Sequence, residues 1–282
     1  MTSTSASRPG TLYIVATPIG HRNDISLRAI DTLKSVDTIL AEDTRHSAPL
    51  LHFLGIQKPL LSLHAYNEDA QSEIIIDALR HGQSFALISD AGTPLISDPG
   101  YPLVKRARAQ GIDVVPIPGP CALIAALSAA GIPCDTFTFY GFLPAKSVAR
   151  LEALHAMVRV PHTVVFYEST HRLLACLLDV MTVFGATCPM VVAKELTKHF
   201  ECFQSDTVAR VHAWLMEEPA RCKGEFVVMI PPRPVENKPH EAEHLLQTLL
   251  TEVSVKQAVK IAGALTSLAK NELYEMALRL KI

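Results

Sequence analysis

The sequence has no apolar stretch long enough to cross a membrane. Its longest strongly apolar run, Cys121–Pro133, is interrupted by a serine and a glycine, whereas a membrane-spanning helix needs about 20 predominantly apolar residues. The first residues, Met1–Gly10, lack the apolar segment of a secretory signal, so a loose tail is expected there. The six cysteines include no C-x-x-C pair, which is typical of reduced thiols in the cytoplasm. These absences predict a cytoplasmic protein that does not enter a membrane.

A strong excess of charge of either sign is also missing. The chain has 26 Lys and Arg against 28 Asp and Glu, for a net charge of −2. This balance disfavours a protein that is basic throughout, although a local basic patch can suffice for binding nucleic acid. With 49% apolar and 19% charged residues, the composition excludes a mainly disordered chain. The length of 282 residues favours about two domains.

Two nucleotide-binding motifs are absent as well. Neither G-x-G-x-x-G nor G-x-x-x-x-G-K-[ST] occurs, which disfavours an ordinary Rossmann dinucleotide site and a P-loop. The pattern H-E-x-x-H does occur, at His240–His244, and on a helix it would place two imidazoles on one face with Glu241 as a base. It follows a proline-rich stretch, its surroundings are polar, and no third ligand follows. We therefore expect a solvated helix start here and no metal site.

Strand-like and helix-like segments alternate along most of the chain. From 11 to 118, short apolar runs alternate with amphipathic segments, which is typical of a parallel α/β sheet. The alternation resumes from 119 to 232. Four prolines within nine residues then indicate a semi-rigid linker, and two periodic apolar segments beyond it predict two short helices. The expected organisation is a flexible tail at 1–10, α/β domains at 11–118 and 119–232, a linker at 233–239 and a helical C-terminal module at 240–282.

Three loops rich in proline and glycine each follow a predicted strand. They are Ala16–Gly20, Asp90–Gly100 and Pro116–Ala122. Ligands of parallel α/β sheets bind at the carboxyl ends of the strands, and glycine there permits close approach of the backbone. Asp90 and Asp98 could accept hydrogen bonds from an amine or hydroxyls. One such loop would be ordinary turn chemistry, but three at the same edge of one sheet predict a shared pocket.

Several blocks of the chain match one superfamily in the same order. They are Leu12–Gly20 (LYIVATPIG), Leu87–Val104 (LISDAGTPLISDPGYPLV), Pro116–Pro133 (PIPGPCALIAALSAAGIP), Val164–Arg172 (VVFYESTHR) and Lys194–Lys198 (KELTK), among others. On these blocks the chain resembles the tetrapyrrole methylase superfamily, whose two-domain α/β architecture is the class III methyltransferase fold. Within it, the resemblance is to the enzymes that methylate a ribose of 16S rRNA, which also carry a small C-terminal helical module.

The resemblance implies S-adenosylmethionine as the cofactor, held between the two α/β domains. It also implies 2′-O-methylation of a cytidine ribose in 16S rRNA of the small ribosomal subunit, by a homodimer. A methyltransferase for small tetrapyrroles and a non-catalytic S-adenosylmethionine-binding protein are the alternatives. The cofactor-binding positions implied by the resemblance are Pro18, Gly20, Asp90, Gly92, Thr93, Pro94, Ser97, Asp98, Pro118, Gly119, Pro120, Tyr140 and Gly141.

A ribose hydroxyl is a very weak acid, so a base within hydrogen-bond reach should accelerate its methylation by about 10²–10⁴-fold. The candidates are Glu168, Lys194, Glu195 and Lys198, along with Asp43. A lysine could act as a base only with a lowered pKa, which burial can provide. Glu195 and Lys198 could equally form a structural ion pair. The sequence leaves the choice open.

Substrate contacts are expected from Asp43 and Arg45 in one loop, from Arg172, and from Lys256 and Lys260 in the tail. The alternative for the first loop is helix capping by its aspartate with a solvated arginine. The two tail lysines are four residues apart and share a helix face, which is either a phosphate-binding face or solvated surface.

The chain departs from the family pattern at three places. His21 stands where asparagine is common, Thr170 stands where proline is usual, and His199–Ser205 lacks the usual glycine. These differences bear on the RNA contacts and not on the cofactor loops.

Overall fold

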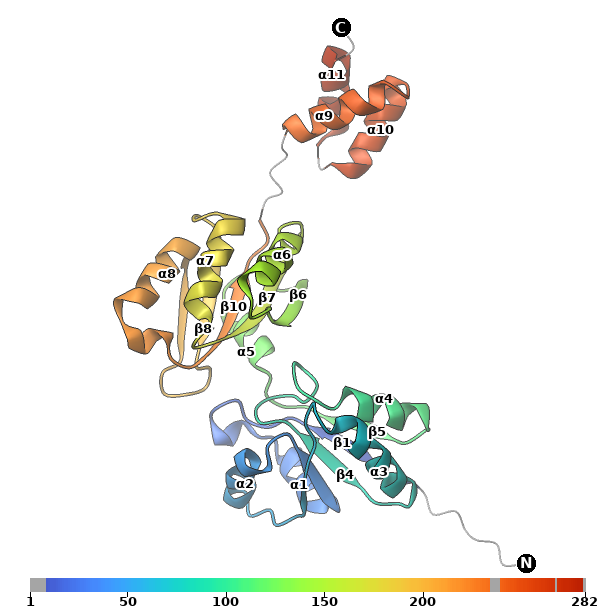
Figure 1. Cartoon of the computed structure of the whole chain (residues 1–282), viewed down its shortest axis with the longest axis vertical. Coiled ribbons are helices and arrows are strands. Elements are labelled where there is room, and N and C mark those ends of the chain that lie inside the picture. The colour runs from blue at the N-terminus through green and yellow to red at the C-terminus, as the bar shows by residue number, and fades with distance from the viewer. Residues whose placement is uncertain (1–8, 234–238, 267, 281–282) are drawn as a thin grey trace, which may run out of the picture. The chain divides into compact units, whose positions relative to one another are not determined.

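The computed structural model describes residues 9–233, 239–266 and 268–280. The chain divides into two compact units, Met1–Pro231 and Pro232–Ile282 (Figure 1). Most of the expected N-terminal tail and most of the expected linker lie outside the described residues.

The first half of the larger unit is a five-stranded sheet in the order β3-β2-β4-β1-β5, and all neighbouring strands are parallel. This confirms the parallel α/β pattern read from residues 11–118. The strands are β1 (Leu12–Val15), β2 (Thr38–Ala41), β3 (Leu60–Ser62), β4 (Phe85–Ile88) and β5 (Val114–Ile117). The helices are the 3-10 turn η1 (Arg22–Asp24), α1 (Leu27–Ser35), α2 (Thr44–Phe53), α3 (Glu68–Arg80) and α4 (Tyr101–Ala109).

Helices cover both faces of this sheet (Figure 1). In β4, Phe85 and Leu87 point to the layer formed with α3 and α4, whereas Ala86 and Ile88 point to the layer formed with α1 and α2. Successive side chains of a strand face opposite sides, so a strand covered on both faces is apolar at every position. This explains why β4 is an uninterrupted apolar run, and it leaves only the strand ends and their loops free for polar chemistry.

The second half is a five-stranded sheet in the order β6-β7-β10-β8-β9. Only β6 and β7 are parallel, and the other three pairs are antiparallel. The alternation read from the sequence therefore gave the α/β class but not the mixed sheet. The strands are β6 (Phe137–Phe142), β7 (Thr163–Ser169), β8 (Pro189–Lys194), β9 (Cys202–Thr207) and β10 (Glu225–Ile230). The helices are α5 (Ala122–Ala129), α6 (Ser147–Met157), α7 (Leu173–Phe184), α8 (Val208–Glu217) and the 3-10 turn η2 (Pro219–Cys222).

Strand β9 was missed by the sequence reading because it is an edge strand with little apolar content. Its residues CFQSDT are mostly half-buried, whereas β8 beside it is buried at five of its six positions. Helices α6, α7 and α8 pack on one face of the sheet, and α5 packs on the other. The segment after β1 contributes Ile19 to the core between the sheet and α5.

The smaller unit contains three helices in its described part: α9 (Pro239–Leu250), α10 (Val255–Leu265) and α11 (Lys270–Leu280). The sequence predicted only the second and third. A helix starts here as expected, with Glu243 and His244 exposed. The sequence reading did not extend it into a third packed helix, in which Ala242 and Leu246 are buried together with Val259 and Leu273. The signal was present in the sequence, because Ala242, Leu245, Leu246, Leu249 and Leu250 recur at helical spacing and form one apolar stripe.

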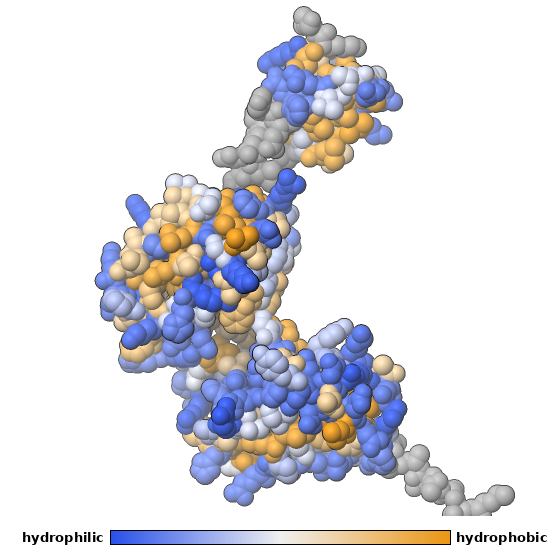
Figure 2. All heavy atoms as spheres, viewed as in Figure 1, coloured by the Kyte–Doolittle hydropathy of each residue, from blue (hydrophilic) through white to orange (hydrophobic). Residues whose placement is uncertain are grey.

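The visible surface carries hydrophilic and hydrophobic residues interspersed over both halves of the larger unit (Figure 2). No helix within the described ranges is long and apolar enough to cross a membrane.

Candidate functional site

A cavity of about 470 Å³ opens at the carboxyl edge of the first sheet. Its walls come from the loops after β1, β4 and β5, from the ends of β6 and β7, and from the start of β10. The lining residues are Ile19, Asp90, Ala91, Gly92, Thr93, Ile96, Ser97, Asp98, Cys121, Ala122, Phe142, Tyr167, Glu168, Ser169, Thr170, His171, Leu196, Gly224, Glu225, Phe226 and Val227. The shared pocket predicted from the proline- and glycine-rich loops is present.

The loop after β4 is tied to the loop after β1. Gly92 and Thr17 form an isolated antiparallel bridge, with Thr17 N donating to Gly92 O at 2.9 Å and Gly92 N donating to Thr17 O at 3.1 Å. Gly92 has φ +86, and a Cβ on it would lie 3.3 Å from Cγ2 of Ile19. Leu95 and Ser97 in the same loop also have φ of 72. Left-handed backbone at residues other than glycine is costly and clusters at functional sites, so this loop has the character of a binding loop.

Three carboxylates converge beside this loop. Burial raises the pKa of Asp98 to about 6, and the negative charges of Glu42 and Asp90 add to the effect against a hydrogen bond from Ser89. Burial also raises the pKa of Glu42, again helped by the charge of Asp90. Like charges held together in a partly desolvated place favour the entry of a cation. This end of the cavity therefore suits a positively charged group.

Aromatic side chains near the ends of β6 and β7, Phe142 and Tyr167, form an apolar part of the wall. The hydroxyl of Tyr167 accepts a hydrogen bond from Leu123 N at 3.1 Å, and the rings of Phe139 and Phe142 pack against it edge-on at 4.8 and 5.5 Å. Burial raises the pKa of Tyr167 well above its usual range, so its hydroxyl stays protonated at neutral pH. An apolar wall opposite a carboxylate cluster suits a ligand that is flat and apolar in one part and cationic in another.

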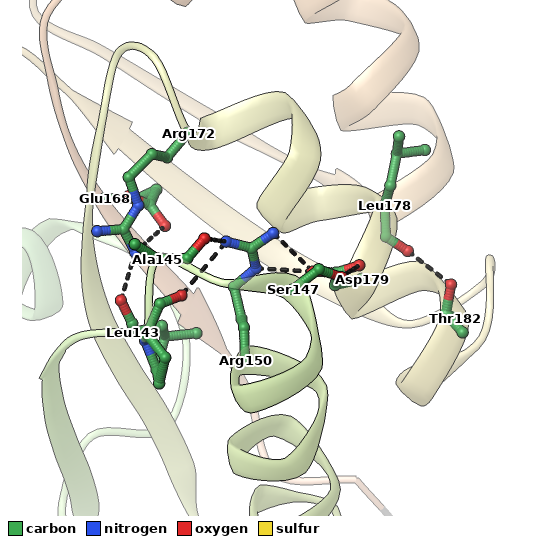
Figure 3. A network of polar contacts seen from close by, with 10 residues as sticks. Leu143, Ala145, Ser147, Arg150, Glu168, Arg172, Leu178, Asp179 and Thr182 are labelled. Carbon is green, nitrogen blue, oxygen red and sulfur yellow. Dashed lines mark hydrogen bonds and ion pairs between the residues drawn. The ribbon is translucent and has the colours of Figure 1, made fainter.

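Glu168 lies in the cavity wall with its side chain fully buried. Oε1 accepts from Ser169 N at 2.8 Å and lies 3.2 Å from Nε of Arg172. Arg172 also donates to the backbone oxygen of Leu143 (Figure 3). The arginine expected to contact substrate phosphate is thus paired with the glutamate expected to act as a base.

A second arginine anchors the same loop after β6 (Figure 3). Arg150 is buried and pairs with Asp179 at 2.7 Å, and its NH1 donates to Ala145 O at 3.1 Å. The hydroxyl of Ser147 also donates to Asp179 at 3.0 Å. Two arginines therefore fix the backbone that leads away from Phe142, one of the cavity-lining residues.

Glu195 and Lys198 form an ion pair at 2.9 Å, and Lys198 also reaches Glu225 at 2.9 Å. Although partial burial opposes it, the hydrogen bond from Lys198 keeps the pKa of Glu195 low. Although burial pulls the other way, hydrogen bonds to Glu225 and Glu195 raise the pKa of Lys198. Both groups stay charged at neutral pH, so the geometry favours the structural ion pair over a base. Lys194 is buried and donates to Ala220 O at 2.8 Å, outside the cavity lining.

The structure brings five of the implied cofactor positions into the cavity lining: Asp90, Gly92, Thr93, Ser97 and Asp98. The other eight do not line it. Two of them touch lining residues, because Pro120 O accepts from the hydroxyl of Thr93 at 2.9 Å, and a Cβ on Gly141 would lie 3.0 Å from Ser97 Oγ.

The remaining six positions include both buried and exposed residues. Pro18 and Pro94 are buried, and Pro118 and Tyr140 are exposed. A Cβ on Gly119 would lie 2.9 Å from that of Ala16. Gly20 packs against the loop after β8, as described below.

The loop with Asp43 and Arg45 begins α2. Asp43 caps the helix by accepting from Arg45 N at 2.8 Å, and the two side chains pair at 2.8 Å. The guanidinium of Arg45 holds the pKa of Asp43 well below its usual range. The capping alternative is therefore realised, with a side chain of Arg45 that is 89% exposed and accessible to a partner.

Lys256 and Lys260 are exposed on α10 of the smaller unit. His240 and Glu241 of the H-E-x-x-H pattern have side chains outside the described set. Among the residues that the structure does describe, no group of three or more His, Cys, Asp or Glu side chains could hold a metal ion.

Several lining residues were not singled out from the sequence. Ile19, Phe142, Tyr167, Leu196 and Gly224 all line the cavity. Ile19, Tyr167 and Leu196 lie inside matching sequence blocks, so for these three the signal was available. Apolar side chains were not selected because nothing in their chemistry marks them until the fold sets them opposite the carboxylates.

Comparison with known families agrees with this architecture. Residues 11–211 match the family model described as Tetrapyrrole (Corrin/Porphyrin) Methylases. The chain belongs to the tetrapyrrole methylase family. Residues 236–281 match a second family model, described as RsmI C-terminal HTH domain. The resemblance and the fold class expected from the sequence are both confirmed.

Relatives within the family align over nearly the whole chain. The protein named "Ribosomal RNA small subunit methyltransferase I" from Pseudomonas aeruginosa is 48% identical over 274 residues, covering 96% of this chain and 97% of that protein. The protein of the same name from Escherichia coli O157:H7 is 48% identical over 271 residues, covering 95% of each chain. The crystal structure of uroporphyrin-III-C-methyltransferase from Thermus thermophilus has a TM-score of 0.53 at 18% identity. That match covers 79% of this chain and 94% of the other, and it supports the fold alone.

Proposed function

We propose that this protein transfers a methyl group from S-adenosylmethionine to the 2′ oxygen of a cytidine ribose in 16S rRNA of the small ribosomal subunit. The observation that carries the proposal is the cavity at the carboxyl edge of the first sheet, in a chain that aligns end to end with proteins named for methylating small-subunit rRNA. Family membership supports a methyltransferase, and the choice of methyl donor rests on the chemistry of the cavity.

The residues present fit S-adenosylmethionine. Asp90 and Asp98 would face its positively charged ammonium and sulfonium groups, because their carboxylates lie close together in a partly desolvated place. Phe142, Leu196 and Val227 would receive the adenine base against the apolar wall. When bound, the group supplies an electrophilic methyl on a sulfonium. The loop backbone of this chain holds its ligand in one orientation, and orientation can supply about 7–11 kcal/mol of the barrier.

Glu168 is the proposed proton acceptor for the ribose hydroxyl. Of the four main candidates, it is the one that lines the cavity. Arg172 fixes the orientation of this carboxylate, because its Nε lies 3.2 Å from Oε1 and its NH2 group donates to Oε2 at 3.4 Å. Glu195 and Lys198 are assigned to the ion pair that holds the loop after β8.

RNA would be engaged at two places. Arg45 offers an exposed guanidinium beside the loop that carries Asp90, since Asp43 N donates to Asp90 Oδ1 at 3.2 Å. Lys256 and Lys260 offer two exposed ammonium groups on one face of α10, in the part that matches a helix-turn-helix domain. Phosphate contacts of this kind fix register and orientation without reading sequence.

A methyl-transfer assay tests the proposal against its rivals. Isolated small subunits, naked 16S rRNA and a uroporphyrinogen are offered separately with labelled S-adenosylmethionine. We expect label in rRNA at one cytidine, where the 2′-O-methyl group blocks alkaline cleavage of the adjacent phosphodiester. Label on a base atom, or on the tetrapyrrole alone, contradicts the proposal, and binding of S-adenosylmethionine without transfer to any acceptor points to a non-catalytic protein.

The proposal extends to a homodimer that works in the cytoplasm, as the resemblance implies. Light scattering on the full chain measures the assembly. A mass near 62 kDa, twice the 30.8 kDa of one chain, is expected, and a monomer at micromolar concentration contradicts this part.

A further inference from the structure

The loop after β1 and the loop after β8 are in close contact at Gly20, where the first loop has no side chain. A Cβ on Gly20 would lie 2.5 Å from Cγ of Lys198, 2.7 Å from Oγ1 of Thr197 and 3.0 Å from the backbone oxygen of Leu196. The next residue completes the contact, because His21 N donates to Oγ1 of Thr197 at 3.0 Å. The two loops belong to different sheets, so this contact joins the two halves of the larger unit.

The loop after β8 is strained where it makes this contact. Glu195 has φ 50 and Thr197 has φ 63. This left-handed backbone conformation is uncommon for any residue other than glycine, and for the β-branched Thr197 it is a genuine outlier. Such strain persists only when the surroundings over-determine it. Here Glu201 accepts from Thr197 N at 2.6 Å, and Glu195 N donates to Glu225 O at 3.0 Å while its carboxylate accepts from Glu225 N at 3.0 Å.

The contact lies beside the cavity. Ile19 precedes Gly20, Leu196 precedes Thr197, and both line the cavity. Both are 8% exposed and belong to one apolar cluster with Leu123 of α5. The separation of these two walls is therefore set by how closely the two loops approach.

We propose that Gly20 and Thr197 are positioning residues: their contact clasps the two halves of the larger unit together and holds Ile19 and Leu196 at the spacing that the cofactor needs. Gly20 acts here by having no side chain, and not by touching the cofactor. The strained backbone of Thr197 points its hydroxyl at His21 N. In a relaxed backbone conformation this hydroxyl would point away from the amide. The inference rests on the proposed function, because it assigns the cavity to S-adenosylmethionine.

Three substitutions of threonine test the clasp in the full chain. Thr197→Val keeps the branched shape and removes the acceptor, Thr197→Ser restores the hydroxyl, and Thr182→Val is the matched control. The hydroxyl of Thr182 donates to Leu178 O at 2.9 Å within α7 (Figure 3), and neither Thr182 nor Leu178 lines the cavity. The readouts are hydrogen exchange at the His21 amide, affinity for S-adenosylhomocysteine by calorimetry, and kcat and KM on small subunits.

Thr197→Val should accelerate exchange at His21 and weaken S-adenosylhomocysteine binding by about 3–10-fold, the effect of one lost hydrogen bond. Thr197→Ser should recover most of both, and Thr182→Val should change neither. Gly20→Ala should weaken binding by about tenfold or more, because its methyl group meets the backbone oxygen of Leu196. Gly263→Ala is its control, since a Cβ there meets only Leu273 at 3.7 Å.

Unchanged S-adenosylhomocysteine affinity in a folded Thr197→Val protein overturns the clasp, as does unchanged exchange at His21. A lower unfolding temperature with native affinity in the folded protein also overturns it, since that is the result of a merely structural contact. Failure of the native protein to bind S-adenosylhomocysteine would sink the proposed function instead. The clasp is then judged by His21 exchange alone, in Thr197→Val against Thr197→Ser.

Discussion

The two halves of the larger unit build the same cavity from opposite kinds of sheet. The first is wholly parallel, so the loops after β1, β4 and β5 all leave from one edge. The second is mixed, and its β7 and β10 run antiparallel with Ser169 opposite Glu225. The first sheet therefore contributes only the carboxyl ends of strands to the cavity, whereas the second sheet contributes the end of β7 and the start of β10.

This difference divides the chemistry between the halves. The parallel half supplies carboxylates on glycine-rich loops, because nothing but loops is free at that edge. The mixed half supplies an apolar wall and side chains that are already paired, such as Glu168 with Arg172 and Glu195 with Lys198. The first half thus offers carboxylates to a positively charged ligand, whereas these charged side chains of the second half are already paired with one another. The predictions below test that division, beginning with the largest effect.

Gly92→Val should abolish the binding contribution of the parallel half. A branched side chain at φ +86 is strained, and its Cβ would lie 3.3 Å from Ile19 Cγ2 inside the cavity. We expect affinity for S-adenosylhomocysteine to fall by more than about 100-fold, or about 2.8 kcal/mol, by calorimetry. Gly111→Val carries the same kind of backbone strain at φ +69 with nothing within 4 Å, so it should bind normally. Equal affinity in the two folded variants would show that the loop is not the binding loop.

Glu168→Gln should remove catalysis and leave binding in place. If Glu168 accepts the ribose proton, kcat on small subunits should drop by about 10²-fold or more. Affinity for S-adenosylhomocysteine should stay within about twofold, because charge recognition belongs to the other half. Glu152→Gln, an exposed position on α6, is the control. A Glu168→Gln enzyme with native kcat would remove this residue from the mechanism.

Asp98→Asn should change the pH dependence of binding. The raised pKa of Asp98, about 6, means that its carboxylate takes up a proton in the ligand-free protein as pH falls through that value. Native affinity for the cationic cofactor should therefore decline below about pH 6, whereas the Asn variant should bind about tenfold more weakly at pH 8 with a flatter profile.

The same substitution should stabilise the ligand-free protein. A carboxyl with a raised folded pKa opposes folding once it is ionised, so this penalty is absent below 3.8 and fully present above about 6. The gain in unfolding temperature from Asp98→Asn should thus be larger at pH 8 than at pH 4.5, as differential scanning calorimetry can measure. A gain that is the same at both pH values would mean that the carboxylate is not desolvated as described.

The double variant Lys256→Gln/Lys260→Gln should give the smallest effect, a change in RNA binding alone. Each lost phosphate contact flattens the dependence of log affinity on log salt by about 0.7–0.9. Cofactor binding in the larger unit should not change. The double variant Lys34→Gln/Lys58→Gln, which removes the same charge from the first half, serves as the control. An unaltered slope for the tail variant would mean that this face of α10 is solvated surface.

Much of the fold could be read from the sequence because apolar periodicity marks each buried element. The uninterrupted apolar run of β4 and the apolar stripe of α3 are local patterns that neighbouring residues carry by themselves. Strand β9 was missed because CFQSDT carries little apolar signal of its own. Helix α9 was missed although its alanine and leucines recur at helical spacing. Their place in the structure depends on neighbours that cover them.

The residues of the site also divide into those that the sequence predicted and those whose role it could not assign. Asp90, Gly92 and Asp98 were found from the sequence because a parallel sheet forces its loops to one edge. The sequence could not decide between ion pair and base for Glu195 and Lys198, because that depends on Glu225, which lies 27 residues further along the chain from the lysine.

By itself, the sequence determined the elements, the parallel first sheet and the loops that carry the carboxylates, because periodicity and turn chemistry act over a few residues. Only the tertiary structure decided that β10 lies between β7 and β8, that Arg172 reaches the backbone oxygen of Leu143, and that Gly20 meets Thr197. These are contacts between residues far apart in the chain. Packing alone brings them to within a few ångströms, and no local pattern records that distance.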